Sequence, residues 1–202
     1  MPDPVQNLNS ALVSTGKPYA SGAIFAGPVW TSGMTLPTSI DDVTSAAGYA
    51  CVGYISDAGV SNEVTTETSE TKAWGGDRVL ESLDSYAETY GFTCIELNET
   101  ALKLAWGSVT GTVAAGLTVD HSSAGFDTAE RVIVIACALK DGRVLLIVIP
   151  KAKLQSIGSI TYNDSDPIGH ELTFSALASG FADNAKATSR HHFSAVPSGS
   201  NG

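Results

Sequence analysis

The chain has 202 residues and a formal net charge of −10, with 43% hydrophobic and only 16% charged residues. This length suits one domain, and 20 glycines in such a mixture are typical of a folded, turn-rich β protein. The acidic balance excludes tight non-specific binding to nucleic acid, because Lys and Arg must replace the counterions of the phosphates. The apolar runs 132–139 and 144–150 are too short to cross a bilayer, and residues 1–10 resemble no export signal, so no membrane association is predicted.

The N-terminal part of the chain combines an expected arm with two predicted strands. Residues 1–22 contain Pro, Asn, Ser and Gly without a strand or helix period, and we expect an extended arm. "GAIFAGPVW", residues 22–30, predicts a first strand and is followed by a long loop, residues 31–48, whose role the sequence leaves open. The β-branched and aromatic residues 49–55 predict a second strand, ended by a turn at residues 57–59.

Residues 60–96 predict a long acidic β-hairpin. The stretch before "WGGD" is rich in Thr and Ser, the two glycines supply a tight turn, and the stretch after it has no helix period. Neither face of this segment is apolar near the turn. Such a pattern is typical of strands that extend beyond the core and project as a ribbon.

One short helix is predicted after the hairpin. Asn98 can cap its N-terminus, Glu99 is favourable beside the positive end of the helix dipole, and Gly107 ends it. Its buried face is expected to contain Leu97, Ala101, Leu104 and Ala105.

The C-terminal half predicts further strands. Residues 110–120 suit a strand region, and two apolar runs joined at "KDG" predict a buried hairpin. Residues 159–164 and 170–177 are expected to pair, and residues 183–202 to form a flexible tail. The whole pattern, about eight strands and one helix, predicts an all-β domain over residues 23–182, either a β-sandwich or a partly closed barrel with one flanking α-helix.

Catalytic and metal-binding signatures are missing from the sequence. It contains no G-x-S-x-G, HExxH, P-loop or GxGxxG motif, so we predict no enzyme and no cofactor. His191 and His192 lack nearby ligands at metal-binding spacing, and residues 163–166 lack the glycine and distant Glu of a calcium loop, so no metal site is predicted. The three cysteines lie far apart and are expected to be free thiols.

The negative charge is concentrated in the predicted hairpin. Residues 51–100 contain ten acids and two bases, whereas acids and bases balance in residues 101–150 and again in residues 151–202. Charges on exposed strands commonly protect sheet edges from pairing with other chains. The alternative is that several copies surround a negative space with their ribbons. DNA could pass through such a space without adhering, because no phosphate would find a cation.

The order of these parts resembles the major tail tube proteins of long-tailed, non-contractile bacteriophages. The likeness extends from Lys17 to about Ala182, and its most specific part is the turn "KAWGGD" with the preceding Thr/Glu stretch. The segments that carry it are "TGKPYASGAIFAGPV", "VGYISDAGVSNEVTTETSETKAWGGDRVL", "GFTCIELNETALKLAWG" and "RVIVIACALKDGRVLLIVIPKAKL".

This resemblance implies a structural virion protein that forms six-membered rings, which stack into a tube that conducts the genome. Implied partners are other copies, a tape-measure protein, a tail terminator and tail-tip proteins, with assembly in the host cytoplasm and DNA passing through unbound. The acidic residues expected to line the lumen are Glu63, Glu67, Glu70, Glu81, Asp84 and Glu88. The residues expected to contact other subunits or rings are Lys72, Trp74, Asp77 and Arg78.

Two points stay open at this level. Strand alternation places Asp84 and Glu88 on the opposite parity from Glu81, so these three side chains cannot all face one way in a regular strand. Two other functions also remain: another tail ring, such as a tail terminator, or an immunoglobulin-like adhesion module.

Overall fold

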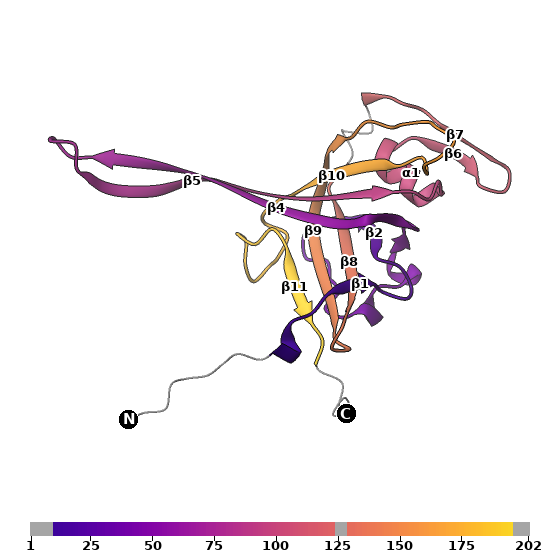
Figure 1. Cartoon of the computed structure of the whole chain (residues 1–202), viewed down its shortest axis with the longest axis horizontal. Coiled ribbons are helices and arrows are strands. Elements are labelled where there is room, and N and C mark those ends of the chain that lie inside the picture. Colours follow the sequence, from indigo (N-terminus) through magenta and orange to yellow (C-terminus); the bar gives the residue numbers. More distant parts are fainter. Residues whose placement is uncertain (1–9, 124–128, 196–202) are drawn as a thin grey trace.

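A computed structural model of the chain describes residues 10–123 and 129–195. Nine strands form one antiparallel sheet with the path β3-β2-β8-β9-β10-β5-β4, to which β1 adds beside β8 and β11 beside β9, while β6 and β7 form a separate hairpin (Figure 1). The strands are β1 (Gly16–Pro18), β2 (Ile24–Val29), β3 (Ala50–Cys51), β4 (Ile55–Lys72), β5 (Arg78–Cys94), β6 (Val109–Thr112), β7 (Gly116–Val119), β8 (Arg131–Leu139), β9 (Val144–Ile157), β10 (His170–Ala176) and β11 (Arg190–Phe193). The described helices are α1 (Glu99–Trp106) and three 3₁₀ turns, Ser10–Leu12, Ile40–Asp42 and Ser45–Ala47.

The large sheet folds over on itself into a sandwich-like arrangement, and it does not close into a barrel. Strand β9 belongs to both layers, because it pairs with β8 up to Ala152 and with β10 from Ala152 to Ile157. The main core lies between the layers and includes Ile24, Tyr90 and Phe174. The expectation of an all-β sandwich with one flanking helix is therefore confirmed, and the barrel alternative is not adopted.

Strand β8 is buried on both faces, as its continuous apolar sequence predicts. Ile133 and Ile135 point into the main core, whereas Val132 and Val134 belong to a second cluster on the opposite side. The loop 31–48 covers this second cluster, with Met34, Leu36, Ile40 and Val43 packed against it. That loop is thus part of the folded body.

Helix α1 begins and ends where the sequence predicts. The Asn98 side chain accepts a hydrogen bond from the Ala101 amide at 2.9 Å, which satisfies one free donor of the first turn. Gly107, at φ 74°, ends the helix, and its amide donates to the Lys103 carbonyl. Leu97 does not join the buried face and is 45% exposed, because it precedes the cap.

The predicted strand at residues 49–55 is wrong in part, and the predicted strand at residues 159–164 is wrong. The segment 49–55 forms only the two-residue β3, and the expected turn at residues 57–59 instead lies within β4, where extra residues make a bulge that Gly59 accommodates at φ 73°. Residues 159–164 form no strand, because both edges of their expected partner β10 are taken by β5 and β9.

Both expected terminal extensions contain residues that join the sheet. In the expected arm 1–22, strand β1 pairs with the end of β8. In the expected flexible tail 183–202, strand β11 pairs with residues 145–148 of β9. Residues 1–9 and 196–202 of these segments lie outside the described ranges. No described helix is both long and apolar enough to cross a bilayer.

Candidate functional site

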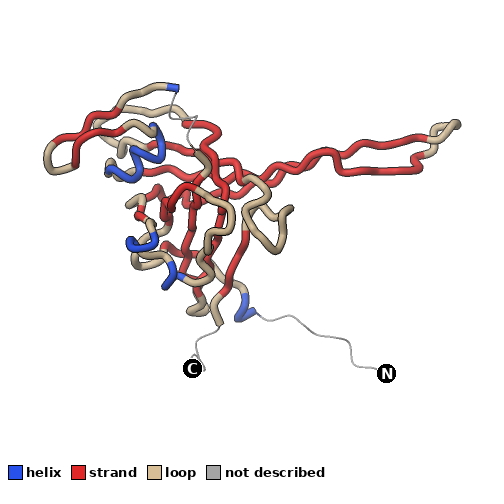
Figure 2. The backbone as a smooth tube through the Cα atoms, turned by 180° about the vertical axis from the view of Figure 1, so that it is seen from behind, coloured by secondary structure: helices blue, strands red, loops and turns tan. Residues whose placement is uncertain are grey.

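The acidic hairpin of β4 and β5 projects far beyond the body of the molecule (Figure 2). Every residue from 61 to 87 is exposed, and the strands are paired up to Lys72 and Arg78. The turn at the tip is closed by a hydrogen bond from the Ala73 amide to the Asp77 carbonyl, with Gly75 and Gly76 at φ 123° and 96°. The predicted projecting ribbon is therefore confirmed.

The ribbon has two faces, which its pairing defines. Directly opposed residues share a face, and successive residues alternate. We call the face that continues from the buried Tyr90 and Phe92 the core-side face; towards the tip it carries Val64, Tyr86 and Leu83. We call the opposite side the open face.

The open face is mainly polar and acidic, and its apolar members are Ala87 and, near the tip, Leu80. It carries Glu63 opposite Thr89 and Glu67 opposite Ser85, whose hydroxyl donates to Glu67 at 3.2 Å. It continues onto β10 with Glu171, Thr173 and Ser175, which neighbour Thr93, Gly91 and Thr89 of β5. Ser175 in turn lies beside Lys153 of β9. The four strands thus share one hydrophilic surface.

A bulge decides the orientation of Asp84. The register of the hairpin shifts between Glu67 and Thr68, which leaves Asp84 as the extra residue on β5. Its carboxylate accepts a hydrogen bond from Ser69 at 2.8 Å, so it is directed to the open face with Glu67. The bulge therefore separates Asp84 from Glu88, which would share a face in a regular strand, whereas Asp84 and Glu81 still face opposite ways.

Glu70 and Glu81 occupy the other face near the tip. They are directly opposed, and both form ion pairs with Arg78, at 3.1 Å for Glu70. All three side chains are well exposed, so each pair contributes only about 0–1 kcal/mol to stability. Their local effect is to balance two like charges that face each other across the ribbon.

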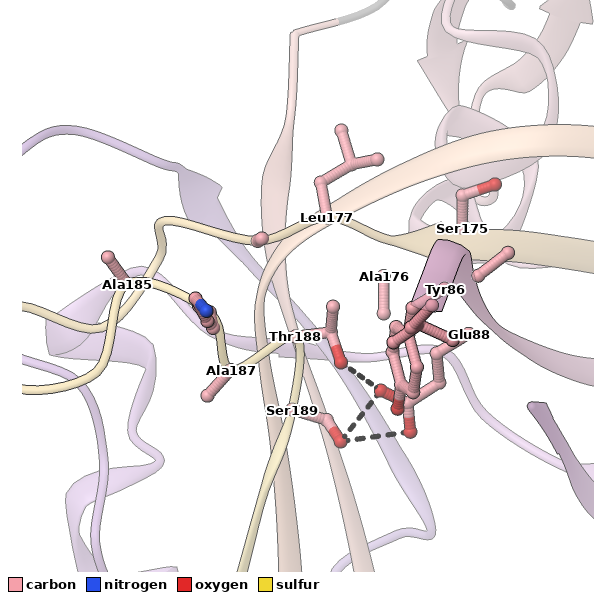
Figure 3. Close-up of a pocket in the computed structure, with 13 residues that line it drawn as sticks. Tyr86, Glu88, Ser175, Ala176, Leu177, Ala185, Ala187, Thr188 and Ser189 are labelled. Atoms are coloured by element: carbon pink, nitrogen blue, oxygen red, sulfur yellow. Dashed lines mark hydrogen bonds between the residues drawn. The ribbon is translucent and has the colours of Figure 1, made fainter. Parts of the chain in front are cut away.

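Glu88 was expected to line the lumen, but it is buried at the base of the ribbon. Its side chain is 6% exposed on the core-side face at the base of the ribbon. The carboxylate accepts hydrogen bonds from Thr188 and, at 3.1 Å, from Ser189 (Figure 3). It also accepts from Tyr90 at 2.9 Å and from Asn62 at 3.0 Å. A carboxylate so enclosed by its own chain cannot line a channel.

The hydrogen bonds keep Glu88 ionised despite its burial. Burial raises the pKa of this carboxyl, but the donors from Thr188, Tyr90, Asn62 and Ser189 together outweigh it and lower the pKa below its ordinary value. Sequence reasoning missed this network because Thr188 and Ser189 lie in the segment expected to be a flexible tail, and no local pattern links them to Glu88.

The four predicted contact residues gather at the end of the ribbon. Trp74 is fully exposed, at 107% of its reference area, and Lys72, Asp77 and Arg78 surround it in the tip turn. Exposed tryptophan is uncommon on a monomer surface and gains much from being covered. The structure therefore brings these four residues together at the tip of the ribbon.

Within residues 10–123 and 129–195, no group of three or more His, Cys, Asp or Glu side chains is placed to hold a metal ion. Cys51, Cys94 and Cys137 are free thiols, as expected from their spacing.

Comparison with known proteins identifies the family. A family model described as "Phage tail tube protein" matches residues 18–196. No curated protein is significantly similar in sequence. Among solved structures, the chain is similar to the cap of the anti-feeding prophage (11% identity, TM-score 0.39, 75% of this chain and 82% of that one). It is also similar to a chain of the PVC sheath-tube complex, an extracellular contractile injection system (14% identity, TM-score 0.39, 70% and 86% coverage). Because the family match includes nearly the whole described body, the chain belongs to the phage tail tube protein family and is a structural component of the tail.

Proposed function

We propose that copies of this chain form six-membered rings that stack into the tail tube, with the open face of β4, β5, β10 and β9 directed towards the lumen. One observation supports this proposal above the others: the hydrophilic, acid-bearing open face extends over four neighbouring strands. In the described chain this face ends at two sheet edges that have no partner strand.

The two edges suit pairing between copies. In the described ranges, β4 pairs only with β5, and residues 153–157 of β9 pair only with β10. The four strands alternate in direction, so β4 of one copy would lie antiparallel to β9 of the next. Pairing of one edge with the other is heterologous, and it generates a closed ring when the rotation closes. Such pairing would also remove a long exposed edge that otherwise invites aggregation.

The charge of the open face suits passage of DNA. Glu63, Glu67, Asp84 and Glu171 present carboxylates, whereas the bases of the ribbon, Lys72 and Arg78, lie at its tip, and Lys153 lies on β9. Phosphates near such a wall would be repelled and would release few counterions. We therefore assign Glu63, Glu67 and Asp84 to the lumen, and we place Glu70 and Glu81 beside Arg78 at the ribbon end.

The ribbon tip would contact other subunits or rings through Lys72, Trp74, Asp77 and Arg78. The tube would assemble in the host cytoplasm with a tape-measure protein, a terminator and tail-tip proteins. A single terminating ring is the competing role within a tail, and it differs in one respect: it would not stack on itself.

Electron microscopy of the purified chain tests this proposal. Negative-stain images over a concentration series should show rings and hollow tubes, and six-fold symmetry in end views. Rings that never stack at any concentration would favour the terminator role. A symmetry other than six would contradict the ring size, and solid filaments would contradict the lumen.

A further inference from the structure

A groove lies beneath the base of the ribbon. It has a volume of about 710 Å³ and a mostly apolar lining. Leu83 and Tyr86 line it from the core-side face of the ribbon, and Leu177 and Ala187 line it from the segment that follows β10. Tyr86, Leu177 and Ala187 are labelled in Figure 3. Glu88 also lines the groove. Its hydrogen bonds with Tyr90 and Ser189 hold this side of the groove in place.

The tip of the ribbon carries a large apolar side chain, Trp74, that is fully exposed to solvent. Trp74 has no cover from its own chain. A two-stranded ribbon that extends into solvent is at best marginally stable, so both ribbon and tip gain from a partner surface.

A chain cannot fill its own groove with its own tip. Leu83, at the outer end of the groove, pairs with Thr68, which lies six positions before Trp74, and at ~3.4 Å per residue the ribbon separates Leu83 from the tip by roughly 20 Å. The ribbon is directed away from the body along its whole length (Figure 1). A tip that enters the groove therefore comes from another copy.

The tip carries the bases Lys72 and Arg78 and the acid Asp77, and Arg78 is already paired with Glu70 and Glu81 of its own ribbon. Asp77 is the tip charge that matches a base of the groove. Asp77 lies in the tip turn beside Trp74, and Lys186 lines the groove. Neither side chain forms an ion pair in the described part of the chain. When Trp74 of one copy enters the groove of another copy, Asp77 of the first copy would lie near Lys186 of the second.

We propose that this groove binds the hairpin tip of a second copy of the same chain, with Trp74 against Tyr86 and Ala187 and with Asp77 beside Lys186. The inference rests on the proposed tube and names the receiving surface for its tip contacts. Each copy presents one tip and one groove, so the contact is heterologous and repeats from copy to copy.

Disulfide trapping tests the contact directly. The double variant Ala73→Cys, Ala185→Cys places one thiol at the tip and one at the rim of the groove, and both positions are exposed. Under mild oxidation, denaturing gels should show a ladder of covalent oligomers, because each copy can link to two others. Each single variant should give no ladder. The wild-type protein shows whether the native thiols Cys51, Cys94 and Cys137 form crosslinks on their own. The matched control, Ala73→Cys with Ser165→Cys, places the second thiol in an exposed turn outside the groove lining.

The outcomes separate this contact from the proposed tube. No ladder from the double variant, or an equal ladder from the control pair, overturns the tip-groove contact. Tubes from wild type without a ladder would leave the proposed function standing, whereas a ladder without tubes would support the contact and count against the tube.

A second measurement uses the assembly itself. Trp74→Ala should impair tube formation, and Ala187→Trp, which fills the groove, should have the same effect. Tyr162→Ala removes another exposed aromatic, 69% exposed and outside the groove lining, and should assemble like wild type. Normal tubes from Trp74→Ala would contradict the proposal.

Discussion

Glu88 accepts a hydrogen bond from the hydroxyl of Thr188, although the two residues are 100 positions apart in the chain. The same carboxylate accepts from Ser189, which directly precedes β11. The base of the projecting hairpin and the C-terminal strand are thereby joined at one buried charge. A change at this point should affect the stability of the body rather than the surface charge of the tube.

Replacing Glu88 by Gln should destabilise the fold by about 1–3 kcal/mol, because the amide group leaves buried donors without an acceptor. Urea denaturation of the purified variant measures this loss. Glu63→Gln is the control, since Glu63 is exposed on the same hairpin; its effect should stay within about 0.5 kcal/mol. Equal stability of both variants would show that the network contributes nothing.

The contribution of Glu88 should depend on pH. Its folded-state pKa lies below the ordinary value of 4.5, so the ionised form is favoured by folding. The stabilisation is therefore present above pH 4.5 and is lost as pH falls through the lowered pKa. The difference in unfolding free energy between wild type and Glu88→Gln should shrink below that pH, and a difference that stays constant in acid would refute this account.

His170 should produce a separate loss of stability in mild acid. Burial lowers the pKa of this imidazole below 6.5, and the nearby His121 lowers it further. The neutral form is then favoured by folding, so its contribution is intact above pH 6.5 and falls as pH drops below that value. Melting temperatures between pH 7.5 and about 5 should decline less for His170→Gln than for wild type. Equal declines would assign the effect to other groups.

Gly27 should not tolerate a side chain. A Cβ at this position would lie 2.6 Å from the Tyr49 ring and 2.9 Å from the Val132 carbonyl oxygen, and the backbone oxygen cannot move aside cheaply. Gly27→Ala should therefore cost about 1–3 kcal/mol by thermal or urea denaturation. Gly16→Ala is the matched control, because its Cβ would meet Cys137 at ordinary contact distances of 3.4 and 3.7 Å.

Reversing charge on the open face should impair genome exit without unfolding the subunit. Glu63→Lys with Glu67→Lys places cations where we propose that DNA passes, and phosphates would then exchange counterions with the wall. Phage that carry the variant should assemble tails but eject DNA slowly, which ejection assays on purified virions measure. The control reverses Asp164 and Asp166, in an exposed turn outside the four strands. Normal ejection from the lumen variant would remove these glutamates from the lumen.

Much of the local structure was predictable because its causes are local. The Asn98 cap, the Asp-Gly turn after β8 and the Gly-Gly turn at the ribbon tip each depend on a few neighbouring residues, and the structure confirms all three. The predicted strand 159–164 failed for the opposite reason: a strand exists only if an edge is free to pair, and both edges of β10 were occupied.

The sequence by itself determined the all-β class, the length of the ribbon and its excess of acids, because composition and alternation act residue by residue. Only the tertiary structure decided which acids share a face. The bulge at Asp84 rotates that side chain towards Glu67, and the distant Thr188 and Ser189 bury Glu88. Both depend on pairing between segments far apart in the chain, where packing and hydrogen bonding override the simple two-residue period of a strand.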